Sequence, residues 1–386
     1  MKKGILFDMI RENGGSFQMS VNNLITLTNN FKKKKIQFVI LTQKKNLELK
    51  NLNLEYKIIK LSISDYLFLI ISNISIFKNL LYKFNVSSSF ERKLIKNKID
   101  LLIFFSTSWK ALLLRKIGFI STVLDVCHYD LWKKKKLKEI SLKVFLIREY
   151  LYKSILPSSF RIITESNDLK IKIIKLYKLE SRRIISIPNL PSFLLHKKKT
   201  AKMETVRTKF NIKGNFFFYP AQFWEHKNHL IILKAIKKLK LQNKNINFVF
   251  CGRDKGYLEN IIKKINEYEI SENVKILDYV NETELFELYK LCEALVMPSY
   301  FGPTNIPPVE AWSLAVPVLY SSLNRKHGKN ACLYFDAESD NQLSQCILKL
   351  DIYKKKLIIR GKKRLKEIRL ENMSGHKTLA NDIQIF

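Results

Sequence analysis

The residues whose types and spacing could do chemistry are most concentrated in Gly302–Glu310, GPTNIPPVE, directly after the apolar run Ala294–Met297. The apolar run predicts a buried strand that ends at Pro298. Pro307 and Pro308 fit the first turn of a helix, because proline lacks the backbone N–H that would be unsatisfied there. A strand-end loop that leads into a helix offers free N–H groups and a partial positive charge, which suit a phosphate. The plainer interpretation is one βαβ unit among several, in which the prolines only set turn geometry.

A second group of candidates follows the apolar strand that opens the segment FFFYPAQFWEHKNHL, residues 216–230. Lys227 can neutralise phosphate charge as a point cation, whereas Gln222 can only form hydrogen bonds. Arg253 lies in the turn GRDKG after the strand predicted over Asn247–Cys251, and the glycine spacing there does not match a GxGxxG dinucleotide fingerprint.

Two histidines of the same segment, His226 and His229, are three residues apart. This spacing invites a metal interpretation, but a zinc site needs three or four ligands and no third one lies nearby in the sequence. Asn228 and His229 are better assigned to capping and packing, and we expect no metal site.

The N-terminal half offers a glycine pair and a histidine. Gly14 and Gly15 follow a strand predicted over Gly4–Met9, and two glycines at a strand-to-helix turn either let the backbone approach a ligand or serve only a tight turn. His128 lies in STVLDVCHYDLW, residues 121–132. A lone histidine titrates near neutral pH and suits acid–base or hydrogen-bonding chemistry, but it is more often structural.

Strands and helices alternate along the chain, and this alternation predicts parallel sheets. With 386 residues the chain is long enough for two domains, each with its own core. We assign residues 1–195 to the first domain, 196–207 to a polar linker and 208–373 to the second domain. The end of the chain is expected to form helices, with a break near Ser374-Gly375. Further strands are expected at 37–42, 56–61, 100–105, 161–164, 184–187, 274–277 and 317–320, and a helix across about 66–97.

The composition is strongly basic, with 69 Lys and Arg against 34 Asp and Glu, a formal net charge of +35. We attribute about half of the excess positive charge to solvated surface lysines. The remaining charge favours a polyanion or an anionic membrane surface as partner. Lysine runs occupy 32–35 and 133–136, and the second directly follows Trp132, an arrangement that suits either a membrane contact or a solvated helix face.

The five cysteines have no CxxC spacing, and no stretch reaches the uninterrupted apolar length of a membrane span. Buried, reduced thiols are the expectation, which points to a reducing cytoplasm. We therefore expect a cytoplasmic protein that is soluble or peripheral at the inner face of the cytoplasmic membrane.

The donor-loop stretch GPTNIPPVEA, the loop around Lys227 and the glycine pair together resemble the retaining glycosyltransferases of family four, the glycosyltransferases group 1. The resemblance implies an α/β GT-B fold, in which two Rossmann-like doubly wound domains face a central cleft. The N-terminal domain would bind the acceptor and the C-terminal domain a nucleotide sugar. A last helix, about residues 374–386, would return to the first domain.

By the same resemblance Glu310 would hold the nucleotide ribose, Lys227 the donor diphosphate, and His128, taken as the family's strand-end histidine, the sugar near its anomeric carbon. These three are the expected catalytic residues. The expected donor-binding residues are Gln222, Lys227, Arg253, Gly302, Thr304, Asn305 and Glu310, and the acceptor-side residues are Gly14, Gly15 and His128. Two positions depart from the common pattern, because Gly302 replaces the first glutamate of E-x7-E and Gln222 replaces an arginine.

The implied activity is retaining transfer of a hexose-type sugar from a nucleotide diphosphate sugar to a glycan or a polyprenyl-diphosphate-linked acceptor. Bacterial surface polysaccharide, such as O-antigen, capsule or lipopolysaccharide, is the implied pathway. No cofactor or metal is expected, since protein cations and helix dipoles would stabilise the leaving group.

Two alternatives remain open from the sequence. A nucleotide-sugar epimerase of GT-B type would share the fold and convert a nucleotide sugar without an acceptor. A basic nucleic-acid-binding protein would use the same net charge, but the lysines are spread along the chain rather than gathered in a recognition module, so nucleic acid is not the expected partner.

Overall fold

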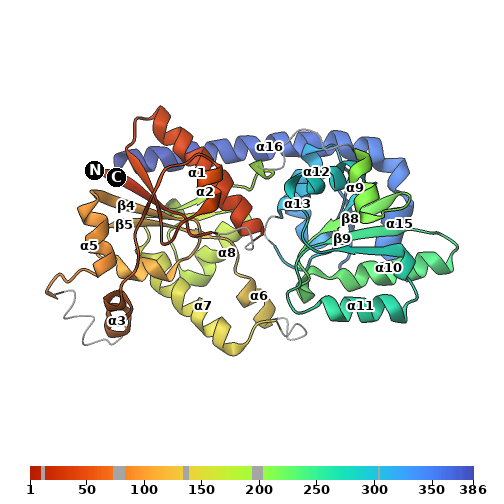
Figure 1. Ribbon diagram of the computed structural model, residues 1–386, viewed down its shortest axis with the longest axis horizontal. Helices are drawn as coiled ribbons and strands as arrows, with labels where there is room; N and C mark the ends of the chain where they lie inside the picture. Colours follow the sequence, from red (N-terminus) through yellow and green to blue (C-terminus); the bar gives the residue numbers. More distant parts are fainter. Residues whose placement is uncertain (10–13, 73–82, 134–138, 194–202, 303–304) are drawn as a thin grey trace. The chain divides into compact units, whose positions relative to one another are not determined.

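The computed structural model describes residues 1–9, 14–72, 83–133, 139–193, 203–302 and 305–386 (Figure 1). The described chain divides into two compact units. The first consists of Met1–Trp132, Ile140–Pro188 and Glu371–Phe386, and the second of Lys133–Glu139 and Asn189–Leu370. The chain passes from the main part of the first unit to the main part of the second after Pro188.

The first unit is built on a seven-stranded parallel sheet of order β3-β2-β1-β4-β5-β6-β7. The central strand β4 has four consecutive fully buried or nearly buried residues from Leu101 to Phe104, as expected of a strand with helices on both faces. The strands are β1 (Lys2–Leu6), β2 (Phe38–Thr42), β3 (Tyr56–Ile58), β4 (Ile99–Phe104), β5 (Gly118–Val123), β6 (Arg161–Thr164) and β7 (Ile184–Ser186).

Helices cover both faces of this sheet (Figure 1). On one face the sheet and the helices share an apolar cluster. It contains Phe104 of β4, Phe68 of α3, Leu94 of α5, Leu113 of η2 and Ile155 of α7. On the other face lie α1 and the end of α16. The bounds are α1 (Gly15–Lys33), α2 (Leu47–Asn51), α3 (Ile63–Ser72), α5 (Ser89–Lys96), η2 (Trp109–Leu113), α6 (Cys127–Lys133), α7 (Leu142–Ile155) and α8 (Asn167–Tyr177).

The second unit is built on a six-stranded parallel sheet of order β10-β9-β8-β11-β12-β13. Its strands are β8 (Phe216–Pro220), β9 (Asn247–Cys251), β10 (Val274–Leu277), β11 (Leu295–Met297), β12 (Val318–Ser321) and β13 (Leu333–Phe335). Its helices include α9 (Met203–Phe210), η6 (Glu225–Lys227), α10 (His229–Leu241), α11 (Leu258–Glu267), α12 (Glu282–Leu291), α13 (Ile306–Ser313), α14 (Arg325–Gly328) and α15 (Asp340–Leu348). Phe216, Phe218 and Tyr219 of β8 are fully buried at its centre.

Both sheets reverse their strand order beside the first strand of the unit. The reversal lies between β1 and β4 in the first unit and between β8 and β11 in the second. In open parallel sheets ligands bind at the carboxyl ends of the strands at such a switch point, because the loops diverge there and leave a crevice. The topology thus marks one candidate ligand position in each unit.

The last helix, α16 (Leu350–Ile385), is continuous, so the predicted break near Ser374-Gly375 is wrong. Gly375 is required for packing instead, because a Cβ atom there would lie 2.5 Å from the carbonyl oxygen of Ser186. Asn372 donates a hydrogen bond of 2.7 Å to the carbonyl oxygen of Pro188, and Arg161 binds Asp382 at 2.7 Å. These contacts fix Glu371–Phe386 within the first unit.

Three further predictions differ from the structure. The helix expected across 66–97 is not continuous, because α3 ends at Ser72 and α5 begins at Ser89. Ser88 caps α5, and its hydroxyl accepts the N–H of Glu91. Residues 203–207 of the expected linker begin α9, where Val206 is buried in the second unit. The first strand is Lys2–Leu6 rather than Gly4–Met9.

No helix in the described part of the chain has the length and hydropathy needed to cross a bilayer. All five cysteines are free thiols.

Candidate functional site

The switch point of the second unit brings together the two loops that the sequence singled out. One loop follows β8 and contains Gln222 and Lys227, and the other follows β11 and contains Gly302 and Glu310. Because β8 and β11 are neighbours in the sheet, both loops leave from the same edge at the point of strand reversal. The expected donor-binding residues are therefore grouped by topology as well as by sequence.

The strand-end loops of this unit are tied to one another by backbone contacts. The N–H of Phe223 donates to the carbonyl oxygen of Arg253 at 3.0 Å, and the N–H of Tyr300 donates to that of His226 at 3.0 Å. Gly252 allows the first contact, since a Cβ atom there would lie 2.3 Å from the carbonyl oxygen of Ala221. The loops after β8, β9 and β11 thus form one connected rim.

Asn228 is the side chain that completes this rim. It adopts the left-handed conformation (φ 58°), which asparagine tolerates better than most residues. Its buried amide donates to the carbonyl oxygens of Pro298, at 3.3 Å, and Ala337, at 2.8 Å, on two other strand-end loops. The sequence suggested only a capping role for Asn228; its φ and long-range bonds require the fold.

The cationic and amide candidates have the following contacts. Lys227 ends η6, is half-buried, and its carbonyl oxygen accepts the hydroxyl of Tyr219 at 2.8 Å. Gln222 accepts the indole N–H of Trp224 at 3.2 Å, so its amide oxygen is engaged within the loop. The Arg253 guanidinium lies over the Tyr279 ring at 5.5 Å from its centroid.

A carboxylate also lies in the Lys227 loop. Glu139 accepts the N–H of His226 and contacts its Nδ1 atom, both at 2.6 Å. Burial acts to raise the pKa of Glu139, but His226 and Lys227 outweigh it, so that the pKa lies below its usual value. Part of the positive charge of this loop is therefore neutralised by a residue that the sequence did not indicate.

His226 and His229 lie in different environments. His226 faces Glu139, whereas His229 is fully buried among the rings of Tyr219, Phe223 and Phe250. Burial lowers the pKa of His229 to about 3, which keeps its ring neutral. The pair does not converge on a common point, in agreement with the packing role expected for His229.

The backbone of the second loop explains the glycine at position 302. Gly302 has φ +126°, a conformation that L-residues rarely adopt, and a Cβ atom there would lie 2.5 Å from Oδ1 of Asn305. Asn305 in turn donates to the hydroxyl of Tyr320 at 2.8 Å and precedes α13 without a side-chain cap bond. A glutamate at position 302 would therefore disturb the start of α13. Thr304 lies outside the described residues.

Glu310 is the most unusual titratable group of the second unit. It lies on α13 with 2% of its surface exposed, and Oε2 accepts the hydroxyl of Tyr289 at 2.9 Å. Burial raises its pKa to about 7, although Tyr289 and the nearby backbone N–H of Ser192 oppose the shift. Among the described residues Oε1 has no partner of hydrogen-bonding geometry. A buried carboxylate oxygen without a donor is costly, which makes a ligand hydroxyl a favourable partner.

In the first unit the glycine pair follows β1 at the switch point. Gly14 has φ +60° and precedes α1, and Gly15 is the first residue of that helix. Two residues that the sequence did not indicate lie at the same edge: Asp8 follows β1, and Lys110 follows β4 and pairs with the Asp8 carboxylate. Asp8 also accepts the N–H of Gln43 at 3.1 Å. The position of Asp8 directly after a strand was the available signal.

His128 does not lie at the end of a strand, because β5 ends at Val123 and His128 belongs to the first turn of α6. It is fully buried, and Nε2 lies 3.0 Å from Oε1 of Glu149. Tyr177 donates to the same Glu149 oxygen at 2.8 Å, and the Tyr152 ring packs edge-on against the imidazole. The expected catalytic role of His128 is not tested by these contacts, which describe a packed and bonded side chain.

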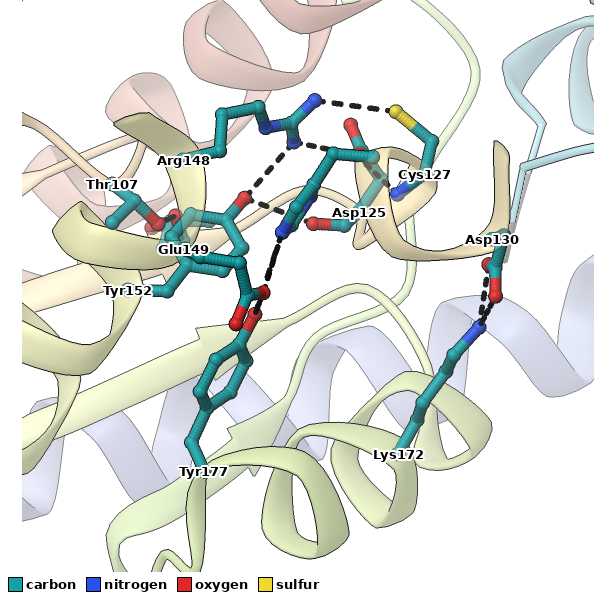
Figure 2. A network of polar contacts seen from close by, with 11 residues as sticks. Thr107, Asp125, Cys127, Asp130, Arg148, Glu149, Tyr152, Lys172 and Tyr177 are labelled. Atoms are coloured by element: carbon teal, nitrogen blue, oxygen red, sulfur yellow. Dashed lines mark hydrogen bonds and ion pairs between the residues drawn. The ribbon is translucent and has the colours of Figure 1, made fainter. Parts of the chain in front are cut away.

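Through its contact with Glu149, His128 belongs to a larger network, which we call the α7 network: Asp125, Cys127, His128, Arg148, Glu149, Tyr152 and Tyr177. Figure 2 shows the other six members. Arg148 binds the Asp125 carboxylate at 2.7 Å and the Cys127 sulfur at 3.2 Å. Tyr152 donates to the carbonyl oxygen of Asp125 at 2.9 Å. The side chains of α7 thus hold the loop that follows β5.

The charges of the α7 network are mutually compensated. Burial acts to raise the pKa of Asp125, but Arg148 and the Cys127 N–H outweigh it, so that the carboxyl stays ionised. Burial likewise acts to raise the pKa of Glu149, and bonds from Tyr177 and His128 reverse the shift. Burial lowers the pKa of His128, which favours a neutral ring that donates from Nε2 to Glu149.

Comparison with known proteins gives a family match for residues 202–328 and a fold for the whole chain. Residues 202–328 match the model of the family Glycosyl transferases group 1. The solved structure of Anabaena HepE in complex with UDP-glucose superposes with a TM-score of 0.71 at 13% identity, covering 99% of this chain and 100% of that chain. The chain has the GT-B fold, with two Rossmann-like domains.

Two curated relatives share sequence with part of the chain. O-antigen chain mannosyltransferase RfbU of Salmonella typhimurium is 28% identical over 193 residues, 49% of this chain and 50% of the relative. O-antigen chain mannosyltransferase B of Escherichia coli is 25% identical over 179 residues, 45% of this chain and 47% of the relative. The chain thus spans about half the length of the curated relatives it matches.

Proposed function

Because residues 202–328 match the glycosyltransferases group 1 within a chain of GT-B fold, we propose that this protein is a retaining glycosyltransferase that moves a hexose from a nucleotide diphosphate sugar to a glycan or lipid-linked acceptor. The observation that carries the proposal is Glu310. It is a buried carboxylate beside the loop at the switch point, and its Oε1 atom has no partner among the described residues. A ribose hydroxyl would donate to that atom.

The diphosphate of the donor would bind to the two loops of the switch point. Lys227 supplies a cation from the loop after β8, and Arg253 supplies a second from the loop after β9, which takes over the contact that Gln222 cannot make. The start of α13 adds a partial positive charge, and Asn305 makes no side-chain cap bond there. In its first turn Ile306 has a backbone N–H, whereas Pro307 and Pro308 have none. Thr304 is proposed as a further phosphate ligand. Stabilising the departing nucleotide diphosphate is the main catalytic task of this arrangement.

On the acceptor side we assign Gly14 and Gly15 to close backbone approach of the acceptor at the switch point of the first unit. His128 would act on the sugar through the loop after β5, which the α7 network holds. His128 would therefore be a positioning residue, because its ring is fully buried and bonded to Glu149.

The acceptor is proposed to be a precursor of bacterial surface polysaccharide carried on a membrane lipid. The names of the two curated relatives support an O-antigen pathway, and the net charge of +35 supports an anionic, membrane-bound acceptor at the inner membrane surface. Mannose is the first sugar to test because both relatives are named as mannosyltransferases, and glucose is the second because HepE was solved with UDP-glucose.

A thermal-shift screen of nucleotide sugars tests the proposal, with GDP-mannose and UDP-glucose among the ligands. Binding to the folded state raises the melting temperature by an amount that grows with the logarithm of ligand concentration over the dissociation constant. We expect one nucleotide sugar to stabilise the protein, with the shift lost in Glu310→Ala and Lys227→Ala and retained in His128→Ala. Transfer assays with that donor should then show lower turnover for His128→Ala.

The same screen separates the alternatives. Conversion of the nucleotide sugar without an acceptor would identify an epimerase. A protein that binds duplex DNA in a salt-sensitive manner, shows no nucleotide-sugar shift and is unaffected by Glu310→Ala would be a nucleic-acid-binding protein. Either result would contradict the proposed transferase.

A further inference from the structure

Helix α3 of the first unit exposes a stripe of large apolar side chains. Its five exposed members are Ile63, Tyr66, Leu67, Ile70 and Ile71, with Ile63 81% and Ile70 63% exposed. The spacing i, i+3, i+4, i+7 and i+8 places all five on one face of the helix. Such a stripe ordinarily faces a protein core, so its position on the surface calls for an apolar partner.

The opposite face of α3 fixes the direction of the stripe. Asp65 is fully buried and accepts the N–H of Ser62 at 2.8 Å and the N–H of Phe90 at 2.7 Å. Phe68 packs into the core of the unit, and the Tyr66 ring lies 5.7 Å from that of Trp109. Because Asp65 and Phe68 are anchored inward, the stripe is held outward.

Helix α7 of the same unit also exposes apolar side chains. Its exposed side chains are Leu142, Val144, Leu146, Ile147 and Tyr150. Both α3 and α7 contact η2 and contribute to the same core cluster, so they flank η2 on one face of the sheet (Figure 1). We call the exposed faces of α3 and α7 together the apolar face.

The charges around the apolar face are of one sign. The exposed cations on and beside these elements are Lys60, Lys83, Arg92, Lys116 and Lys143. Lys153 of α7 is also exposed but forms an ion pair with Glu149 at 3.2 Å. The carboxylates of α3 and α5, Asp65 and Glu91, are fully buried, and Glu149 of α7 is bonded to His128 and Tyr177. An apolar surface with a cationic border complements a bilayer that contains anionic lipids. A second copy of the chain would instead bring two cationic borders together.

We propose that the apolar face inserts into the interfacial region of a bilayer with anionic lipids, with the side chains of α3 and the first turns of α7 among the acyl chains. The inference deepens the proposed membrane location of the acceptor and rests on it, but it does not depend on sugar transfer. It names the elements that make the contact, which the lysine runs alone did not.

Vesicle flotation tests the inference. The protein without nucleotide sugar is mixed with phosphatidylglycerol-containing vesicles or with pure phosphatidylcholine vesicles. We expect binding to the first, reduced by high salt, and on the order of tenfold or greater weakening in Leu67→Glu/Ile70→Glu, because two exposed apolar side chains that would enter the bilayer are replaced by anions. Ile352→Glu/Ile359→Glu is the matched control, since these exposed isoleucines lie on α16 in the second unit. It should lower binding by twofold at most.

Hydrogen exchange on the wild-type protein gives a second measurement that does not depend on a variant's folding. Amides of 63–72 and 142–150 should become protected when phosphatidylglycerol vesicles are added. The inference is overturned if the wild type does not bind these vesicles, if both double variants bind alike, or if the α3 variant instead changes a dimer into a monomer. A nucleotide-sugar thermal shift that persists while vesicle binding fails would reject the membrane contact and leave the proposed transferase standing.

Discussion

The two units differ in how the charge of their carboxylates is compensated by neighbouring donors. In the α7 network of the first unit, Asp125 and Glu149 are each bonded to donors and keep pKa values below their usual range. At the switch point of the second unit, Glu310 is buried with a single side-chain donor, Tyr289, and its pKa rises to about 7. A compensated network stabilises a loop by itself, whereas an uncompensated carboxylate costs stability until a ligand completes it.

The largest expected effect is the pH dependence that Glu310 imposes on folding. Its folded pKa of about 7 lies above the ordinary value of 4.5, so the folded state holds the proton more tightly and stability falls as the pH rises between the two values. The contribution of Glu310 to the free energy of unfolding falls by roughly 2–3 kcal/mol between pH 5 and pH 8. Glu310→Gln should remove this contribution, so that from pH 5 to pH 8 the free energy of unfolding changes more favourably in the variant than in the wild type, as measured by urea denaturation at both pH values. The buried histidines, whose lowered pKa values act in the opposite direction, contribute equally to both proteins. An unchanged pH dependence in the variant would refute the buried, uncompensated state.

The α7 network should show the opposite sign. The pKa of Asp125 is lowered from 3.8, so its contribution is fully present above that value and is lost only as the pH falls through the folded pKa. Asp125→Asn should therefore leave the slope between pH 5 and pH 8 unchanged and remove part of the acid-side loss.

Arg148→Met breaks the compensation in the first unit. It leaves Asp125 without its cation, and because both side chains are about one-third exposed we expect a loss of about 2 kcal/mol rather than the larger value of a fully buried pair. Asp125→Asn in the same chain should recover most of the loss in urea denaturation. Arg182→Met is the control, since its pair with Glu180 is exposed and should contribute little. Equal effects of Arg148→Met and Arg182→Met would show that the network does not hold the loop.

Gly302→Ala tests whether the donor loop requires glycine at position 302. The substitution combines an unfavourable φ with a clash against Asn305, and we expect it to cost about 1–2 kcal/mol and to weaken nucleotide-sugar binding. Gly256→Ala is matched for φ, at +92°, but a Cβ atom there meets nothing within 4 Å. It should therefore show strain alone, with nucleotide-sugar binding retained. Identical binding by the two variants would remove the special role of Gly302.

The sequence was sufficient for elements whose apolar runs are bounded by turn residues. The strands at 161–164, 247–251 and 274–277 were predicted with the observed bounds. It failed where the deciding contact is distant in the chain. The break expected at Gly375 is absent because this glycine accommodates the backbone of Ser186, 189 positions earlier in the printed sequence.

The candidate site shows the same division. Lys227 and Glu310 could be selected because each follows a predicted strand in a stretch that resembles the glycosyltransferases group 1. The topology then grouped the two stretches at one switch point. The burial of His128, its bond to Glu149 and the pairing of Asp125 with Arg148 depend on how α7 packs against β5. No local pattern in the sequence carries that information.

The most direct test of the central claim is a calorimetric titration of the nucleotide sugar that gives the largest thermal shift. Glu310→Gln is compared with Glu287→Gln, because Glu287 is also a buried carboxylate of the second unit with a raised pKa but lies on α12, outside the strand-end loops. We predict a dissociation constant raised on the order of tenfold to a hundredfold by Glu310→Gln, since a charged acceptor of ligand hydroxyls is lost, and unchanged within twofold by Glu287→Gln. Equal dissociation constants for both variants and the wild type would contradict the assignment of the donor site.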